Sequence, residues 1–254
     1  MLIIISPSKT QDFSTGSSIK LKTQPSFLAE TGLLVKELKK KSVKQIIKLM
    51  DVSPQIASLN FERYKQFHTP FTPDNAKQAL LAFKGDVYTD IEVDDYKKEE
   101  LQFAQKHLRI LSGLYGLLQP LDLIQPYRLE MKIKLKYKRR KNLYQFWGSR
   151  ITELLNEDLK KSNDKVLINL ASKEYFKVIQ EKDLQAKVIT PIFKDYKNGE
   201  YKIIAIFAKR ARGMMTNYII RNNIENVEEI KLFHQAGYNY DDNLSGENEW
   251  VFNR

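Results

Sequence analysis

The side chains best suited to chemistry gather between Arg128 and Arg150, where nine lysines and arginines occur with a single acid, Glu130. Within this stretch, residues 132–138 alternate between lysine and an apolar residue. Because successive side chains of a strand point to opposite faces, the alternation predicts a strand with its lysines facing solvent and its apolar residues buried. The lysines are Lys132, Lys134, Lys136 and Lys138, and the apolar residues are Ile133, Leu135 and Tyr137. Such a basic surface suits a polyanion, of which nucleic acid is the commonest.

A second candidate is the loop at residues 6–10, Ser-Pro-Ser-Lys-Thr, which follows the apolar run from Leu2 to Ile5. The run predicts a buried central strand, and open α/β sheets bind ligands at the carboxyl ends of such strands. The loop offers hydroxyls and the amine of Lys9, but it lacks the glycines of a phosphate-binding loop. The spacing alone therefore favours a plain surface turn.

Metal and nucleophile chemistry find little support in the sequence. The three histidines, His68, His107 and His234, are far apart and show no metal-ligand spacing. Without cysteine, neither a thiolate nucleophile nor a zinc–cysteine site can form. Ser6 and Ser112 lack the G-x-S-x-G elbow and an assignable base. We therefore expect no metal and no cofactor.

The composition is that of an ordinary globular protein, with 42% apolar and 29% charged residues in a chain of 254. The net charge of +11 bears on partners rather than on the fold, and a lysine-rich solvated surface is its simplest explanation. No apolar run is long enough for a membrane span, and the start MLIIISPSKT lacks the features of a signal peptide. We expect a soluble, cytoplasmic monomer.

Three amphipathic segments predict helices at residues 27–40, 43–50 and 54–67. Ser42 can cap the second helix, and Ser53-Pro54 supplies an N-cap and a first-turn proline for the third. The residues expected on the buried face of the third helix are Ile56, Ala57, Leu59 and Tyr64. Ser53 and the free N–H groups beside it could bind a DNA phosphate, and a simple packing hairpin is the alternative.

Helices and strands follow one another irregularly in the rest of the chain. Expected helices cover residues 72–83, 94 or 95 to about 107, 143–160, 173–177 and 211–222, with a short one after Asn226. Expected strands cover 108–111 and 165–170, with hairpins pairing 188–196 with 201–208 and 238–240 with 249–252. No strict βαβ repeat and no linker interrupts the pattern. The sequence therefore predicts an α+β (mixed α/β) fold, a mixed sheet surrounded by helices, in a single domain over residues 1–254.

Six motifs spread over nearly the whole chain resemble those of the YaaA family of peroxide-stress proteins. They are ISPSKT, FKGDVYTDI, LRILSGLYGLLQPLDLIQPYRLEM, LYQFWG, VLINLASKEYF and AKRARGMM. The resemblance implies a cytoplasmic bacterial protein of the peroxide response, linked to limiting free iron and thus Fenton damage to DNA. It also implies a DNA-binding fold with a positively charged cleft and a helix-hairpin-helix element, which corresponds here to residues 43–67.

The same motifs contain eight cations, each at or near a predicted strand end or break. They are Lys9, Lys84, Arg109, Arg128, Lys173, Lys209, Arg210 and Arg212. Several cations converging at loop ends form the kind of cleft that binds phosphate. We expect these residues and Ser53 to contact DNA, whereas any one of them alone could be an exposed or salt-bridged side chain.

Binding of this kind should be salt-sensitive and independent of base sequence, because no major-groove reading module is recognisable. The second hypothesis is an enzyme that acts on a nucleotide or nucleic acid held by the same cations. Carboxylates within the motifs that could serve it are Asp86, Asp122, Glu130 and Glu174. Carboxylates beside cations usually form structural ion pairs, however. The third hypothesis is an interaction protein whose charge serves only solubility.

Overall fold

The apolar run at the start of the chain forms β1 (Leu2–Ile5), a strand with all four residues buried. It pairs in parallel with β5 (Leu108–Ser112) on one side and with β8 (Val166–Leu170) on the other. Strands covered on both faces are largely apolar, and this pattern predicted all three segments, although β5 contains Arg109 and β8 contains Asn169. The computed structural model describes residues 1–17, 19–162 and 164–254.

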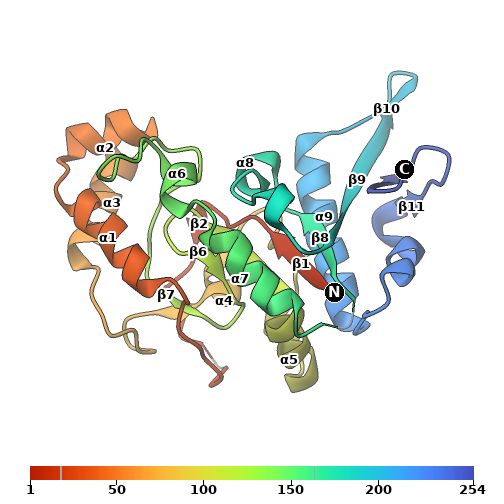
Figure 1. Cartoon of the computed structure of the whole chain (residues 1–254), viewed down its shortest axis with the longest axis horizontal. Helices are drawn as coiled ribbons and strands as arrows, with labels where there is room; N and C mark the ends of the chain where they lie inside the picture. The colour runs from red at the N-terminus through yellow and green to blue at the C-terminus, as the bar shows by residue number, and fades with distance from the viewer. Residues whose placement is uncertain (18, 163) are drawn as a thin grey trace.

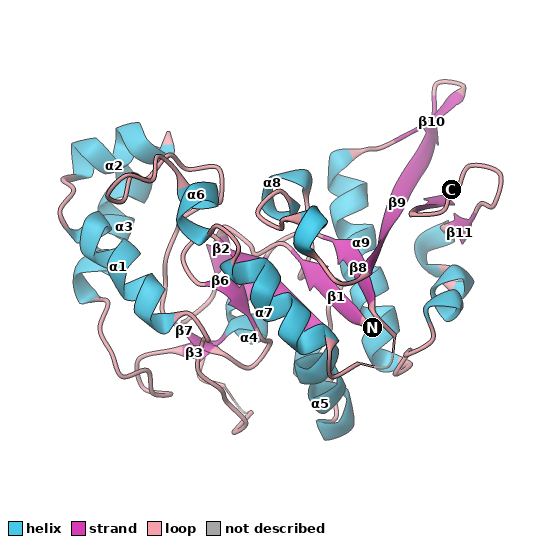
Figure 2. Cartoon of the chain, viewed as in Figure 1, coloured by secondary structure: helices cyan, strands magenta, loops and turns pink. Residues whose placement is uncertain are grey.

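The other strands extend this sheet in both directions (Figure 2). They are β6 (Gly116–Leu118), β9 (Lys187–Lys197), β10 (Glu200–Lys202), β11 (Asn239–Tyr240) and β12 (Glu249–Asn253). β9 and β12 continue the parallel run beyond β8, whereas β6, β10 and β11 pair antiparallel with β5, β9 and β12. Two short ladders join β2 (Thr10–Gln11) to β4 (Phe83–Lys84) and β3 (Lys77–Gln78) to β7 (Leu123–Ile124). The predicted mixed sheet within a single α/β domain is confirmed.

Helices surround the sheet, and Figure 1 shows α1, α2 and α3 together at one end of the molecule, with β9 and β10 at the other. The α-helices are α1 (Leu28–Lys39), α2 (Val43–Met50), α3 (Pro54–Gln66), α4 (Ala79–Ala82), α5 (Lys98–His107), α6 (Leu143–Trp147), α7 (Arg150–Leu159), α8 (Lys173–Phe176) and α9 (Ala205–Arg221). Four 3₁₀ turns are η1 (Val93–Asp95), η2 (Glu181–Asp183), η3 (Val227–Leu232) and η4 (Gln235–Gly237). No helix of the described residues is long and apolar enough to cross a bilayer.

The first three helices form as their capping residues predict. Ser42 accepts from the Gln45 amide in a capping box that starts α2, and the Ser53 hydroxyl accepts from the Ile56 amide at the start of α3. One expectation was wrong, because Leu59 is 51% exposed. The buried face of α3 passes instead through Asn60, whose side-chain Nδ2 donates to the Ile56 carbonyl 2.8 Å away.

Two further predictions of regular structure were wrong because tertiary contacts outweighed local pattern. Residues 72–83 give β3 and the four-residue α4 instead of one helix, because β3 pairs with β7 and the Gln78 side chain donates to the carbonyls of Ile19 and Leu21. The strand expected over 201–208 ends at Lys202, and α9 begins at Ala205, six residues before its predicted start. Residues 208, 211, 215 and 219 of α9 are buried, which is helical rather than strand spacing.

Residues 143–160 also differ, since Gly148, with φ of 54°, separates α6 from α7. The helix expected from residue 94 or 95 begins at Lys98, after η1. The terminal hairpin of β11 and β12 and the tight turn after β9 form as predicted.

The basic stretch at 132–138 is not a strand of any sheet, although its side chains alternate as expected. We call residues 126–137 the strap. Residues 130–133 form a turn in which the Ile133 amide donates to the Glu130 carbonyl at 3.1 Å, and the one bridge of the strap joins Tyr137 to Arg140. Ile133 and Leu135 are buried, Tyr137 is half-buried, and the lysines between them are exposed. The alternation therefore recorded the burial of an irregular segment packed on the core, which requires no neighbouring strand.

Candidate nucleic-acid interface

The strap crosses the edge of the sheet at which the parallel strands β1, β5 and β8 end. Gly113, directly after β5, allows it to approach, since a Cβ there would lie 2.1 Å from the Leu129 carbonyl oxygen. The hydroxyls of Tyr127 and Ser112 lie 2.7 Å apart, and the Tyr64 hydroxyl of α3 donates to the Arg128 carbonyl. Ser112 at the end of β5 and Tyr64 of α3 thus hold the strap from two sides.

This anchoring brings Lys9, Arg128 and Glu130 together. Arg128 Nη2 donates to Glu130 Oε1 at 2.8 Å, and Lys9 Nζ lies 3.5 Å from the same oxygen. The Glu130 side chain is only 6% exposed, whereas that of Lys9 is 61% exposed. The carboxylate therefore lies beneath the two cations, and the lysine amine remains open to an incoming anion.

A hollow of about 590 Å³ opens beside this cluster, between the strap and α2. Six cations and two acids line it, together with Gln45, Leu49, Met50 and Ile133. The cations are Lys9, Lys41, Lys48, Arg128, Lys132 and Lys134, and the acids are Asp51 and Glu130. We call it the basic hollow. Its surplus of positive charge suits a phosphate-rich ligand.

Sequence reasoning missed the contribution of α2 to this hollow. Gln45 and Lys48, three residues apart, lie on one face of α2, and Lys41 directly precedes its N-cap residue Ser42. That spacing was a usable signal, because the buried residues Ile46 and Met50 lie on another face. It could not show that the exposed face looks toward the strap.

A hydrogen-bonded bridge between two strand ends places α8 next to the Lys9 loop. The Ser172 amide donates to Ser6 Oγ at 2.9 Å, and Tyr88 donates its hydroxyl proton to the Ser6 carbonyl at 2.9 Å. Lys173, the first residue of α8, is exposed at this edge. The structure therefore brings Lys173 to the same sheet edge as Lys9 and Arg128.

Four more predicted cations lie on the flank formed by α9 and the segment after β4. Gly213 lets the helix touch this segment, because a Cβ there would lie 2.0 Å from the Val87 carbonyl oxygen. Three of the cations are in ion pairs: Lys84 with Asp94, Lys209 with Asp86 and Arg210 with Asp90. The fourth, Arg212, is partly buried, and burial lowers the pKa of its guanidinium. Three of these charges are thus already balanced within the chain.

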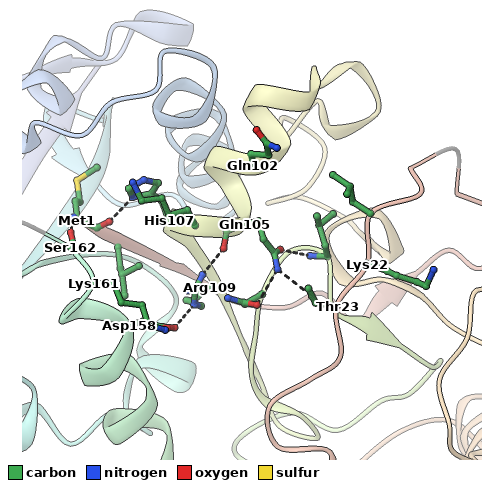
Figure 3. A pocket seen from close by; sticks show the side chains of 15 residues that line it. Met1, Lys22, Thr23, Gln102, Gln105, His107, Arg109, Asp158, Lys161 and Ser162 are labelled. Carbon is green, nitrogen blue, oxygen red and sulfur yellow. Dashed lines mark hydrogen bonds and ion pairs between the residues drawn. The ribbon is translucent and has the colours of Figure 1, made fainter.

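Arg109 lies away from the other cations, at the sheet edge where the parallel strands begin (Figure 3). Its Nε donates to Asp158 Oδ2 at 2.8 Å, and its Nη1 donates to two backbone carbonyls. A cavity of about 490 Å³ adjoins it, lined also by Met1, His107 and Ser162. Because Arg109 is 4% exposed and its charge is balanced, it serves the fold here.

Ser53 is exposed at the start of α3 and uses its oxygen to cap that helix, 3.4 Å from the Ile56 amide nitrogen. It does not line the basic hollow, although Asp51 of the same connection does. Among residues 1–17, 19–162 and 164–254, no three His, Asp or Glu side chains converge as a metal site would require.

Comparison with known proteins places the chain in a family. The family model of the peroxide stress protein YaaA matches residues 1–244. The chain belongs to the YaaA family. A UPF0246 protein of Colwellia psychrerythraea is 52% identical over 254 residues, all of this chain and 99% of that relative. A UPF0246 protein of Acaryochloris marina is 55% identical over 254 residues, all of both chains.

Membership of the YaaA family confirms the resemblance suggested by the six sequence motifs. Two of the motifs meet in the structure, because ISPSKT supplies Lys9 and the end of the long leucine-rich motif supplies Arg128 and Glu130. The strap thus brings Arg128 and Glu130 to Lys9, from which they lie 119 and 121 positions away in the sequence.

Proposed function

We propose that the protein binds the DNA backbone in the basic hollow, without reading base sequence, during peroxide stress. The observation that carries this proposal is the hollow's lining of six cations against two acids. Ammonium and guanidinium groups neutralise phosphates and release counterions, which supplies most of the affinity of non-specific binding. Lys173 at the same sheet edge, and Ser53 with the start of α3, would extend the contact along the duplex.

Protection against peroxide follows from the same contacts. Ferrous iron is a cation that oxygen ligands such as phosphates bind, and hydroxyl radicals made there attack the nearest sugar. Lysines on those phosphates would exclude the iron and cover the sugars. We therefore propose that DNA binding limits Fenton damage, which agrees with the peroxide-stress description of the YaaA family.

The experiment measures affinity for a DNA duplex as a function of salt for three proteins. The test variant carries Lys132→Gln and Lys134→Gln, both in the basic hollow. The control carries Lys98→Gln and Lys160→Gln, which remove the same charge from exposed positions outside the hollow. Each phosphate contact contributes about 0.9 to the slope of log affinity against log salt.

We expect the test variant to lose nearly two units of slope and the control to match the unsubstituted protein. Duplexes of different sequence should bind alike. Equal loss in both variants, or strong preference for one base sequence, would refute binding in the hollow. In a parallel assay with ferrous iron and peroxide, the unsubstituted protein should reduce strand breakage more than the test variant does.

A further inference from the structure

Glu130 is a carboxylate that DNA binding alone does not need. A negative charge beneath a phosphate site weakens binding, yet Glu130 lies at the floor of the basic hollow and 5% of it is exposed. Both cations that contact it, Arg128 at 2.8 Å and Lys9 at 3.5 Å, use Oε1. The second oxygen, Oε2, is buried and has no hydrogen-bond partner among the described residues.

The other buried carboxylates of the described chain differ in this respect. Asp122 uses one oxygen for Thr23 and the other for the Gln119 amide. Asp158 and Asp195 likewise have both oxygens engaged. A carboxylate that serves only the fold is fully bonded in this protein, whereas Glu130 is held by one oxygen and free at the other. Free buried acceptors are costly and call for a functional explanation.

A small recess lies between the strap and the loop that carries Lys9. Its volume is about 10 Å³, the space that one water needs. It shares Lys9, Arg128 and Glu130 with the basic hollow, so the two adjoin at these residues. Arg128 Nε is a second buried group without a partner among the described residues. Two residues that line a recess of one-water size thus carry a buried donor and a buried acceptor without partners, beside a site for phosphate.

We propose that Glu130 is the general base of a hydrolase site that cleaves a phosphoester of a nucleic acid or nucleotide. This inference rests on the proposed function, since the basic hollow must hold the phosphate. Glu130 Oε2 takes a proton from a water in the recess as the water oxygen attacks phosphorus. The P–O ester bond breaks, and the leaving alkoxide takes a proton from Lys9. The products are a phosphate with one ester bond fewer and an alcohol.

The remaining groups complete this cycle. Arg128 keeps its charge and its bond to Glu130 Oε1, which holds the carboxylate in place and stabilises charge developing on the phosphoryl oxygens. After the step Glu130 is protonated and Lys9 is neutral. Because Lys9 Nζ and Glu130 Oε1 lie 3.5 Å apart, the proton can return to the amine and restore both groups. The chain supplies every group in the step, with the water.

The test incubates the purified full-length protein with end-labelled single-stranded DNA, the matching duplex and free deoxynucleoside monophosphates, in ¹⁸O-water containing EDTA. The substrates distinguish a nucleic-acid phosphodiester from a nucleotide monoester. Incorporation of ¹⁸O into the phosphate product identifies attack at phosphorus. The test variant is Glu130→Gln, and the control is Glu99→Gln, an exposed carboxylate of α5 that lines neither the basic hollow nor the recess.

We expect turnover on one substrate, a loss of about 100-fold or more for Glu130→Gln, and little change for Glu99→Gln. DNA affinity of Glu130→Gln should be equal or higher, because a negative charge has gone. Glu130→Asp keeps the charge but withdraws the oxygens, and should also lose rate if Glu130→Gln proves unstable. Absence of turnover on all substrates, or turnover that survives Glu130→Gln, overturns the hydrolase. If the unsubstituted protein does not bind DNA, the proposed function is refuted instead.

Discussion

Arg109 and Arg128 show that the surroundings of a cation, and not only its residue type, decide whether it can contact a ligand. Both lie in one sequence motif, and both were predicted to contact phosphate. Arg109 points to the starting edge of the parallel strands, where Asp158 balances its charge. Arg128 lies on the strap beside Lys9 and lines the basic hollow. The sequence indicated two cations near strand ends, but not the edge to which each side chain turns.

Replacing Arg109 with Met should destabilise the protein without weakening DNA binding. The change leaves the buried Asp158 with the exposed Lys161, at 3.1 Å, in place of a buried guanidinium partner. Breaking a buried pair costs about 3–5 kcal/mol, and the remaining contact with Lys161 should reduce that loss. Urea unfolding measures the loss. Adding Asp158→Leu should restore much of the stability, because the buried charge is then gone. A large loss of DNA affinity in the folded Arg109→Met protein would contradict the structural role.

His107 should make stability depend on pH. Burial lowers the pKa of its imidazole from 6.5, despite its bond to the Met1 carbonyl at 2.8 Å. Lys106 and the N-terminal amine lower the pKa further, while Glu225, 3.4 Å from Nε2, raises it. A group with a lowered folded pKa contributes stability above its unfolded value and loses it as pH falls through the folded one.

We therefore expect the free energy of unfolding to decline as pH falls below about 6.5, before most carboxylates titrate. His107→Gln should remove this part of the decline. Chemical denaturation of both proteins between pH 5 and 8 measures the difference. If the free energies of unfolding of the two proteins decline in parallel, protonation of His107 does not destabilise the folded state.

At the scale of elements, local signals predicted the ends of α2 and α3 well and the middle of the chain poorly. Ser42 and Ser53 act through hydrogen bonds within three residues, so their effect could be read from adjacent sequence. The strap and β3 depend on partners far along the chain, such as Ser112 for Tyr127 and Ile124 for Lys77. The sequence shows only the apolar pattern of these segments and not their partners. That pattern cannot distinguish the strap from a strand of a sheet.

Gly113→Ala should disturb the strap and the basic hollow together. The new methyl would lie 2.1 Å from the Leu129 carbonyl oxygen, so the strap must move, at a cost of about 1–3 kcal/mol. Thermal unfolding and DNA affinity should both fall. The control is Gly32→Ala in α1, where the methyl meets no atom within 4 Å and should stabilise the helix slightly. Unchanged DNA affinity in Gly113→Ala would show that the position of the strap does not matter for DNA binding.

At the scale of the whole molecule, the sequence predicted a mixed sheet in one domain, and the structure confirms it. The net charge of +11 indicated a polyanion as partner but not where it would bind. The fold distributes the motif cations over three places: the basic hollow with the nearby α8, the ion-paired flank of α9, and the buried pair at Arg109. Exposed cations with few acids nearby occur in the basic hollow, and we therefore assign DNA binding to it.

The most direct test of that assignment maps lysine reactivity with and without DNA. An amine-reactive reagent and peptide mass spectrometry report how accessible each lysine is. With duplex DNA bound, we expect strong protection of Lys9, Lys41, Lys48, Lys132 and Lys134, which line the basic hollow. Lys98 and Lys160, exposed outside it, should react as before. Protection of Lys98 and Lys160 with unchanged reactivity in the hollow would contradict the account.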